Sequence, residues 1–227
     1  MNLTENLNGV RFRIRAACAR ANRREEDVML IAVTKTVESN SIQEAVDNGV
    51  KHIGENRVQD AEGKIQALGS VATWHLIGHL QTNKVKKAVQ LFDFIHSVDS
   101  FHLAQEISNR ADQAGGKMSC LIEVNTSGEE SKFGVRPDDA LDLVRRIAPL
   151  RGISIQGLMT IGAFLPDADQ VRPCFKMLKQ VSQEIAAAAV PGVAMTHLSM
   201  GMTNDFEVAI EEGATMIRVG RAIFGER

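Results

Sequence analysis

The sequence predicts an α/β protein: a (β/α)8 barrel of the TIM type with one additional helix at its N-terminus. Eight short apolar segments alternate with seven segments of helical period, which is the element count of such a barrel. The strand segments are apolar almost throughout, as expected for strands covered on both faces. We treat residues 1–227 as a single domain, because one α/β barrel reaches this length without splitting.

The additional helix is expected over residues 4–22. Its apolar positions recur at three- and four-residue steps, as in an amphipathic helix: Leu3, Leu7, Val10, Ile14, Ala17 and Ala21. Six arginines lie between Arg11 and Arg24, which is also a feature of organelle transit peptides. The helical period favours a structural helix over a targeting segment.

The remaining elements follow in alternation. The predicted strands are Met29–Thr34, His52–Gly54, Trp74–Gly78, Phe94–Val98, Cys120–Asn125, Ile153–Met159, Thr196–Ser199 and Met216–Val219. The predicted helices between them are Ser41–Asn48, Val58–Leu68, Lys84–Leu91, Phe101–Ala114, Pro137–Ala148, Val171–Ala189 and Asn204–Glu212. A doubly wound open sheet is the alternative, but such sheets usually have a glycine-rich turn after the first strand. Here Thr34-Lys35-Thr36 stands in that place.

Composition excludes several classes of protein. A net charge of -2 gives no global field for polyanions, so we expect no nucleic-acid partner. The three cysteines are far apart and odd in number, which fits neither a disulfide framework nor a Cys-x-x-Cys metal site. No apolar run approaches the ~20 residues of a membrane span, so we expect no membrane partner. A cytoplasmic location is expected for such a chain.

Lys35 is the first candidate functional residue. It follows an apolar strand, where contact with the core would remove part of its hydration and favour the nucleophilic amine. Such a lysine is suited to forming a Schiff base with an aldehyde or ketone. The alternative is an ordinary strand-end lysine whose stem covers apolar surface while its ammonium stays in water.

Two late loops are the second candidate feature. Barrels frequently bind phosphate at the loops after strands seven and eight, through glycine amides, hydroxyls and a helix N-terminus. Ser199 offers a hydroxyl there, and Gly201 and Gly220 permit close backbone approach. Thr203 or Asn204 could cap the following helix. The alternative is a pair of ordinary turns that contain glycine.

A Schiff-base lysine combined with a phosphate site indicates a ligand with both a carbonyl and a phosphate. Pyridoxal 5′-phosphate is one such ligand, and a ketose phosphate held by an aldolase is the other. Barrel aldolases commonly carry their lysine on a later strand, whereas Lys35 follows the first.

Six blocks of the chain, in order and over its whole length, resemble the pyridoxal phosphate homeostasis proteins. This family is related to the N-terminal barrel of alanine racemase. The blocks are Ala32–Thr36, Gly54–Asn56, Trp74–Lys84, Gly157–Thr160, Leu198–Met202 and Arg218–Gly225.

The resemblance implies a role for each matching residue. Lys35 would carry the cofactor as a Schiff base. Ser199, with backbone amides around Gly201, Gly220 and Arg221, would hold the phosphate. Arg218 would face the pyridine nitrogen. Asn56 and His79 would line the pocket.

The resemblance also implies a carrier that supports vitamin B6 homeostasis, with no catalytic residues. Pyridoxal phosphate-dependent apo-enzymes are the candidate recipients. Because arginine only donates hydrogen bonds, Arg218 would leave the ring nitrogen unprotonated and weaken the cofactor as an electron sink.

A low-activity amino-acid racemase is the alternative function. Racemases of this kind need an acid or base on both faces of the ring, one of them a tyrosine from a second domain of a partner subunit. This chain has no tyrosine and ends at Arg227 without such a domain, so we expect a monomeric carrier.

Three further features of the sequence do not change the expected function. His75 lies within a strand and His79 after it, so we expect no metal site there. Residues 84–87 (Lys-Val-Lys-Lys) are best explained as a solvated helix face rather than an RNA site. Residues 129–134 form a polar loop that could act as a lid.

Overall fold

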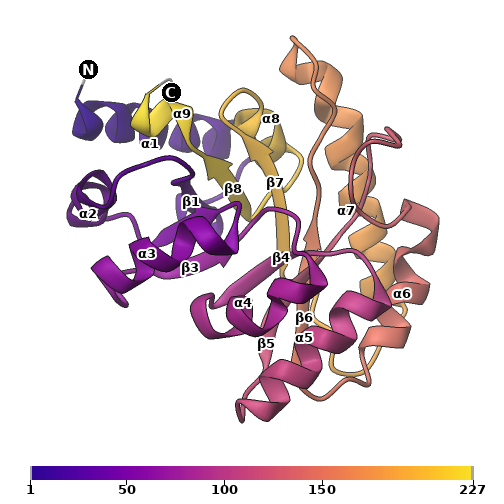
Figure 1. Cartoon of the computed structure of the whole chain (residues 1–227). Coiled ribbons are helices and arrows are strands. Elements are labelled where there is room, and N and C mark those ends of the chain that lie inside the picture. The colour runs from indigo at the N-terminus through magenta and orange to yellow at the C-terminus, as the bar shows by residue number, and fades with distance from the viewer. Residues whose placement is uncertain (1, 226–227) are drawn as a thin grey trace.

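A computed structural model describes residues 2–225 and contains a closed barrel of eight parallel strands (Figure 1). The strands pair in chain order, and β8 pairs back with β1, so that Ile31 lies opposite Arg218. They are β1 (Met29–Val33), β2 (His52–Glu55), β3 (Thr73–Leu76), β4 (Phe94–Val98), β5 (Met118–Glu123), β6 (Ile153–Met159), β7 (His197–Met202) and β8 (Met216–Val219). The predicted fold class is confirmed.

Helices surround the barrel and connect its strands. They are α1 (Leu3–Arg20), α2 (Ser39–Asp47), α3 (Val58–Leu68), α4 (Val85–Leu91), α5 (Phe101–Gln113), α6 (Ala140–Ile147), α7 (Arg172–Ala187), α8 (Phe206–Glu211) and α9 (Arg221–Phe224). The sequence did not predict α9, because four residues are too few to show a helical period. None of the helices within residues 2–225 combines the length and apolar character of a membrane span.

Helix α1 lies in the outer layer beside α2, α8 and α9 (Figure 1). Its arginines make the connections. Arg13 pairs with Glu207 of α8 at 2.7 Å, and Arg20 pairs with Glu211 at the same distance. Arg11 Nη2 donates to the carbonyl of Asn48 at the end of α2 (2.7 Å). These contacts support the structural interpretation of the arginine-rich segment.

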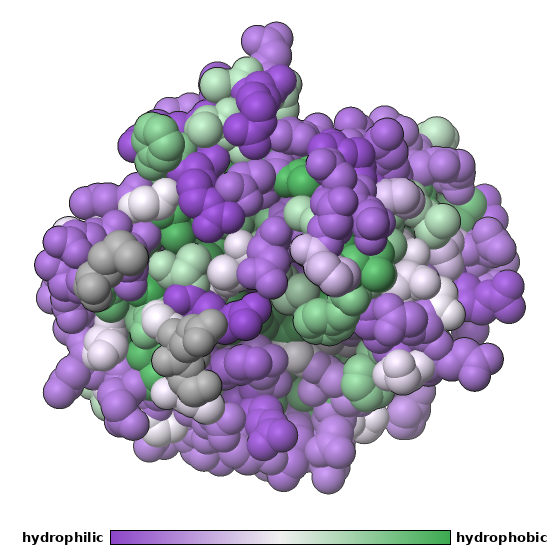
Figure 2. Space-filling view, turned by 90° about the horizontal axis from the view of Figure 1, so that it is seen from above, coloured by the Kyte–Doolittle hydropathy of each residue, from purple (hydrophilic) through white to green (hydrophobic). Residues whose placement is uncertain are grey.

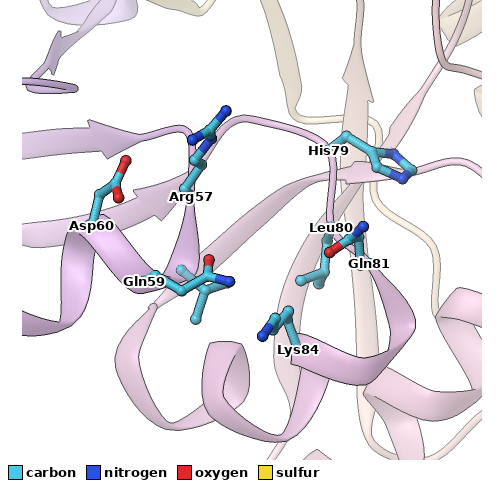
Figure 3. Close-up of a pocket in the computed structure, with 8 residues that line it drawn as sticks. Arg57, Gln59, Asp60, His79, Leu80, Gln81 and Lys84 are labelled. Atoms are coloured by element: carbon cyan, nitrogen blue, oxygen red, sulfur yellow. The ribbon is translucent and has the colours of Figure 1, made fainter.

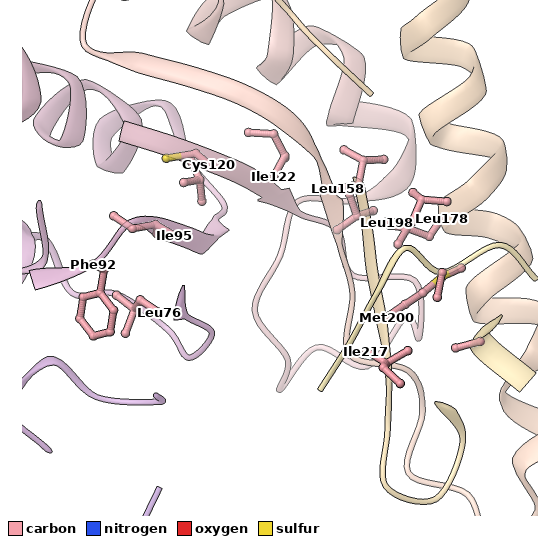
Figure 4. Close-up of a cluster of buried hydrophobic side chains, with 14 of the residues drawn as sticks. Leu76, Phe92, Ile95, Cys120, Ile122, Leu158, Leu178, Leu198, Met200 and Ile217 are labelled. Atoms are coloured by element: carbon pink, nitrogen blue, oxygen red, sulfur yellow. The ribbon is translucent and has the colours of Figure 1, made fainter. Parts of the chain in front are cut away.

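Side chains of the strands alternate between two apolar layers. Those that point outward, such as Leu76, Ile95 and Ile122, belong to a large cluster with buried residues of the helices, among them Leu178 of α7 (Figure 4). Those that point inward form a smaller cluster of Ile31, Leu121, Met159 and Met216. Apolar side chains therefore fill part of the barrel interior below its mouth.

The segment after β6 differs in detail from the prediction. Strand β7 continues to Met202 instead of ending at Ser199, and its register with β8 shifts between these two residues. Asp205, not Thr203 or Asn204, is the N-cap residue of α8. The Asp205 side chain instead accepts a hydrogen bond from the Met202 amide (2.5 Å), which closes the turn between β7 and α8.

Candidate functional site at the mouth of the barrel

The candidate residues gather at the C-terminal ends of the strands, as the fold requires. Figure 2 looks onto this end from above and shows apolar surface in a hollow near the middle, framed by hydrophilic residues. Lys35, Asn56 and His79 follow β1, β2 and β3, respectively. Ser199 and Gly201 lie in β7, and Arg218 lies in β8 with Gly220 directly after it.

Lys35 lies in a tight turn that leaves β1. The turn is closed by a hydrogen bond from the Val37 amide to the Thr34 carbonyl (2.9 Å). Within it, Thr36 has φ of 60°, a left-handed conformation that is uncommon for a β-branched residue. Strained backbone of this kind clusters at ligand-binding and active sites. Lys35 itself is exposed. The expectation that contact with the core removes part of its hydration is therefore wrong.

A buried polar cluster holds the backbone immediately before Lys35. Thr34 Oγ1 donates to Glu55 Oε1 (2.6 Å), and both residues are fully buried. Lys64 of α3 donates to the same carboxylate oxygen (2.7 Å) and to the Thr34 carbonyl (2.6 Å). Charge-assisted hydrogen bonds of this type are strong, so the turn has a fixed base. This cluster was not predicted, because Lys64 lies on a helix and its contact with β1 and β2 is not visible in the sequence.

Arg218 is a buried cation at the end of β8. Only 4% of it is exposed, and its guanidinium donates to Ser199 Oγ (2.6 Å) and to the Thr160 carbonyl (2.8 Å). Burial lowers the pKa of Arg218 to about 10, against the opposing influence of Asp205 and Glu123. Arg218 therefore remains protonated at neutral pH and offers only donors to a ligand.

Ser199 lies one layer deeper than the sequence suggested. It is fully buried, and its Oγ contacts His96 Nδ1 (3.0 Å) as well as Arg218. A phosphate contact by Ser199 stays a prediction, but this hydroxyl already has two partners within the protein.

Two glycines bring backbone close together on the β7–β8 side. Gly201 has φ of 92°, and a Cβ there would lie 2.5 Å from the Cβ of Ala209. A Cβ on Gly220 would lie 3.2 Å from the carbonyl oxygen of Val33. Within α9 the first amides with helical partners are those of Ile223 and Phe224, both bonded to the Gly220 carbonyl. The amides of Arg221 and Ala222 take no part in that ladder.

Glu123, which the sequence did not indicate as a site residue, is a carboxyl group at the C-terminal end of β5. It is 4% exposed, and its Oε2 has no hydrogen-bond partner among the described residues. Burial, reinforced by Asp99 and opposed by Arg218, raises the pKa of Glu123 to about 7. A carboxyl with such a pKa exchanges protons near neutrality, which is typical of functional sites.

Asn56 and His79 occupy different parts of the mouth. Asn56 Oδ1 is buried without a partner among the described residues. The ring of His79 stacks on Phe133 with centroids 3.7 Å apart, so the loop after β5 reaches across to β3. His79 Nδ1 lies 3.7 Å from Asp99 Oδ2.

A cavity of about 520 Å³ lies next to His79 at the mouth of the barrel (Figure 3). Gln59 and Lys84 project toward it from α3 and from the segment between β3 and α4. His79 contributes to its wall, whereas Asn56 does not. Within the described part of the chain, no group of three or more His, Cys, Asp or Glu side chains is arranged to hold a metal ion.

The sequence analysis missed His52, His75, His96 and Glu123 as site candidates. Each lies in a predicted strand segment, and His75 alone was considered further, as a metal ligand together with His79. Four of the six histidines of the chain lie within strands, and that clustering was the available signal.

Comparison with known proteins gives a consistent set of relatives. The family model for the N-terminal domain of alanine racemase matches residues 6–227. The pyridoxal phosphate homeostasis protein of Aquifex aeolicus is 45% identical over 228 residues, covering 100% of this chain and 99% of that protein.

Solved structures agree with these relatives. PipY of Synechococcus elongatus with pyridoxal phosphate bound superposes with a TM-score of 0.84 at 34% identity, covering 99% of this chain and 100% of that one. An alanine racemase of Clostridium difficile shares the fold, with a TM-score of 0.74 at 18% identity, over 100% of this chain and 57% of the racemase.

Proposed function

Because this chain belongs to the alanine racemase N-terminal domain family and, within it, to the pyridoxal phosphate homeostasis proteins, we propose that it binds pyridoxal 5′-phosphate and serves in vitamin B6 homeostasis. Lys35 would hold the cofactor through a Schiff base. The observation that supports this proposal is the pairing of β1 with β8: Lys35 follows the end of β1, and the buried Arg218 lies on the neighbouring strand β8. An aldehyde carbon and a ring nitrogen at opposite ends of one ligand match that pair.

The residues of the mouth fit the cofactor. Asn56 Oδ1 is a buried acceptor that lacks a partner among the described residues, as expected where a ligand supplies one. Gly201 and Gly220 are too closely packed to carry a side chain without a shift of their neighbours, so the backbone on the β7–β8 side is not covered by side chains of these two residues. The amides of Gly220 and Arg221 would hold the phosphate there. His79 would line the opposite side of the pocket.

The bound cofactor supplies an electrophilic carbon and a ring that can accept electrons. Arg218 limits the second property, because a protonated guanidinium donates to the ring nitrogen and cannot accept its proton. We therefore infer a carrier without efficient catalysis. The name carried by its relatives refers to homeostasis and to no reaction. We further propose a monomer in the cytoplasm that supplies pyridoxal phosphate-dependent apo-enzymes.

Borohydride reduction tests the proposal. The wild-type protein incubated with pyridoxal phosphate and reduced should carry one pyridoxyl adduct on Lys35 by peptide mass spectrometry. Lys35→Ala should abolish that adduct and leave thermal unfolding unchanged, because an exposed side chain contributes little to stability. Lys51→Ala, at another exposed lysine, is the matched control and should retain the adduct. An adduct on a different lysine in the wild-type protein would overturn the assignment.

A low-activity racemase is the second candidate, and Glu123 is the observation that favours it. A group with a pKa of about 7 at the mouth can accept or donate a proton at neutral pH. Exchange of the α-proton of alanine in deuterated water separates the two functions. A carrier gives very slow exchange that Glu123→Gln does not change, whereas a racemase loses roughly 10²–10⁴-fold in rate in that variant.

A further inference from the structure

A row of polar side chains crosses the otherwise apolar interior of the barrel. His52 Nδ1 lies 3.1 Å from His75 Nε2, and His75 Nδ1 lies 2.9 Å from His96 Nε2. The row continues from His96 Nδ1 to Ser199 Oγ at 3.0 Å and ends at Arg218 Nη1, 2.6 Å further. We call these five residues the histidine chain. It links β2, β3, β4, β7 and β8.

The histidine chain is deeply buried except at its His52 end. His96 and Ser199 are fully buried, His75 is 1% exposed, and Arg218 is 4% exposed. His52 is half-buried at the start of β2, near the N-terminal mouth of the barrel. Phe94 stacks on His75 with ring centroids 5.5 Å apart. Burying three imidazoles among apolar side chains is costly unless their hydrogen bonds are satisfied.

Arg218 determines which group donates in each hydrogen bond of the histidine chain. A guanidinium can only donate, so Ser199 Oγ accepts from Arg218. The buried hydroxyl must then place its own proton on an acceptor, and His96 Nδ1 is the one it contacts. Burial lowers the pKa of His96 well below its ordinary value and that of His75 to about 3, so both rings are neutral near pH 7.

A neutral imidazole that accepts at Nδ1 carries its proton on Nε2. His96 Nε2–H therefore donates to His75 Nδ1, and His75 Nε2–H donates to His52 Nδ1. Each ring thus turns its unprotonated, electron-rich nitrogen toward Arg218. Three aligned ring dipoles in a medium of low dielectric strengthen one another and favour a positive charge at the arginine end.

We propose that the histidine chain is a polarised device that stabilises the charge of Arg218 and fixes its orientation beneath the cofactor ring, with His75, His96 and Ser199 as positioning residues. This proposal rests on the proposed function only in assigning the ring to Arg218. It assigns a role to the polar side chains of the barrel interior, because among the described residues the buried guanidinium donates to Ser199 and to the Thr160 carbonyl and to no carboxylate. It also commits the single Ser199 proton to His96, so this hydroxyl does not donate to phosphate.

Nitrogen NMR of the ligand-free protein tests the polarity directly. In protein labelled with ¹⁵N-histidine, His75 and His96 should each show a protonated Nε2 and an unprotonated Nδ1 at pH 7. A proton on Nδ1 of either ring would overturn the proposal. This measurement needs no variant and no cofactor, so it stands apart from the borohydride experiment on Lys35. Failure of that experiment removes the proposed function and leaves the polarity intact.

Substitutions test the positioning role. His96→Asn keeps an acceptor for Ser199, whereas His96→Leu removes it. His96→Leu leaves the Ser199 hydroxyl without its acceptor and so loosens its bond to Arg218. It should weaken pyridoxal phosphate about tenfold to a hundredfold, the scale of one hydrogen bond to a charged group, and should shift the absorbance maximum of the bound cofactor. His96→Asn should restore both toward the wild-type values. His197→Leu is the matched control, because His197 is also in the barrel but its Nδ1 has no partner among the described residues.

Pyridoxal without its phosphate completes the test. Ser199→Ala should weaken pyridoxal and pyridoxal phosphate by equal factors if Ser199 acts through Arg218. A loss confined to pyridoxal phosphate would show a phosphate contact and overturn the positioning role. Equal spectra for His96→Leu and the His197→Leu control would overturn it as well.

Discussion

Glu123→Gln should make the protein more stable at alkaline pH and leave its stability at acid pH nearly unchanged. The folded state holds the Glu123 proton up to a pKa of about 7, whereas the ordinary value is 4.5. Between these values the folded protein binds more protons than the unfolded chain, so stability falls as pH rises. At about 1.36 kcal/mol for each pH unit, the carboxyl costs about 3 kcal/mol once pH exceeds 7. Glutamine is nearly isosteric with glutamate and does not titrate.

Urea unfolding of both proteins at pH 5 and pH 8.5 measures this cost. The stability of Glu123→Gln relative to wild type should increase by roughly 2–3 kcal/mol between the two pH values, because part of the transition lies below pH 5. Other titrating groups are common to both proteins and cancel in the difference. Glu130→Gln, at an exposed carboxyl, should show no such change. A pH-independent difference for Glu123→Gln would refute the reasoning from burial.

Two further substitutions test the base of the site. Thr34→Val should destabilise the protein by about 1–3 kcal/mol in urea unfolding, because it removes a donor from the buried Glu55 carboxylate; an unchanged midpoint would show that Lys64 alone satisfies it. Arg218→Glu should increase α-proton exchange of bound amino acids in deuterated water, since a carboxylate stabilises a protonated ring nitrogen. Exchange that stays at the wild-type rate in cofactor-loaded protein would contradict the electronic role of Arg218.

The fold was predictable because its signals are local. Apolar segments such as Cys120–Asn125 and the three- and four-residue steps of the first helix are visible in single windows of sequence. The ends of elements were less accessible. Strand β7 runs beyond Ser199 because a register shift against β8 carries it onward, and pairing of this kind is invisible in one strand alone.

The site was predictable in part. Lys35, Asn56, His79 and Arg218 lie at strand ends as expected, since the barrel fixes where each strand stops. The histidine chain was not predictable. Its successive members are 19 to 103 residues apart, and only the stagger of neighbouring strands brings them within hydrogen-bond distance. The role of Glu123 was not predictable for the same reason, because its burial depends on strands that lie far away in the sequence.

The position of α1 has a consequence for synthesis of the protein. Arg13 and its partner Glu207 are separated by 194 residues, and Asn6 donates to the carbonyl of Ile223 near the other end of the chain. At ribosomal rates of about 5–20 residues per second, α1 waits roughly 10–40 s for these partners. Its apolar stripe, with Leu7, Val10 and Ile14, is uncovered on the nascent chain throughout that time. This helix is thus synthesised long before its partners α8 and α9 and can be packed against them only at the end of synthesis.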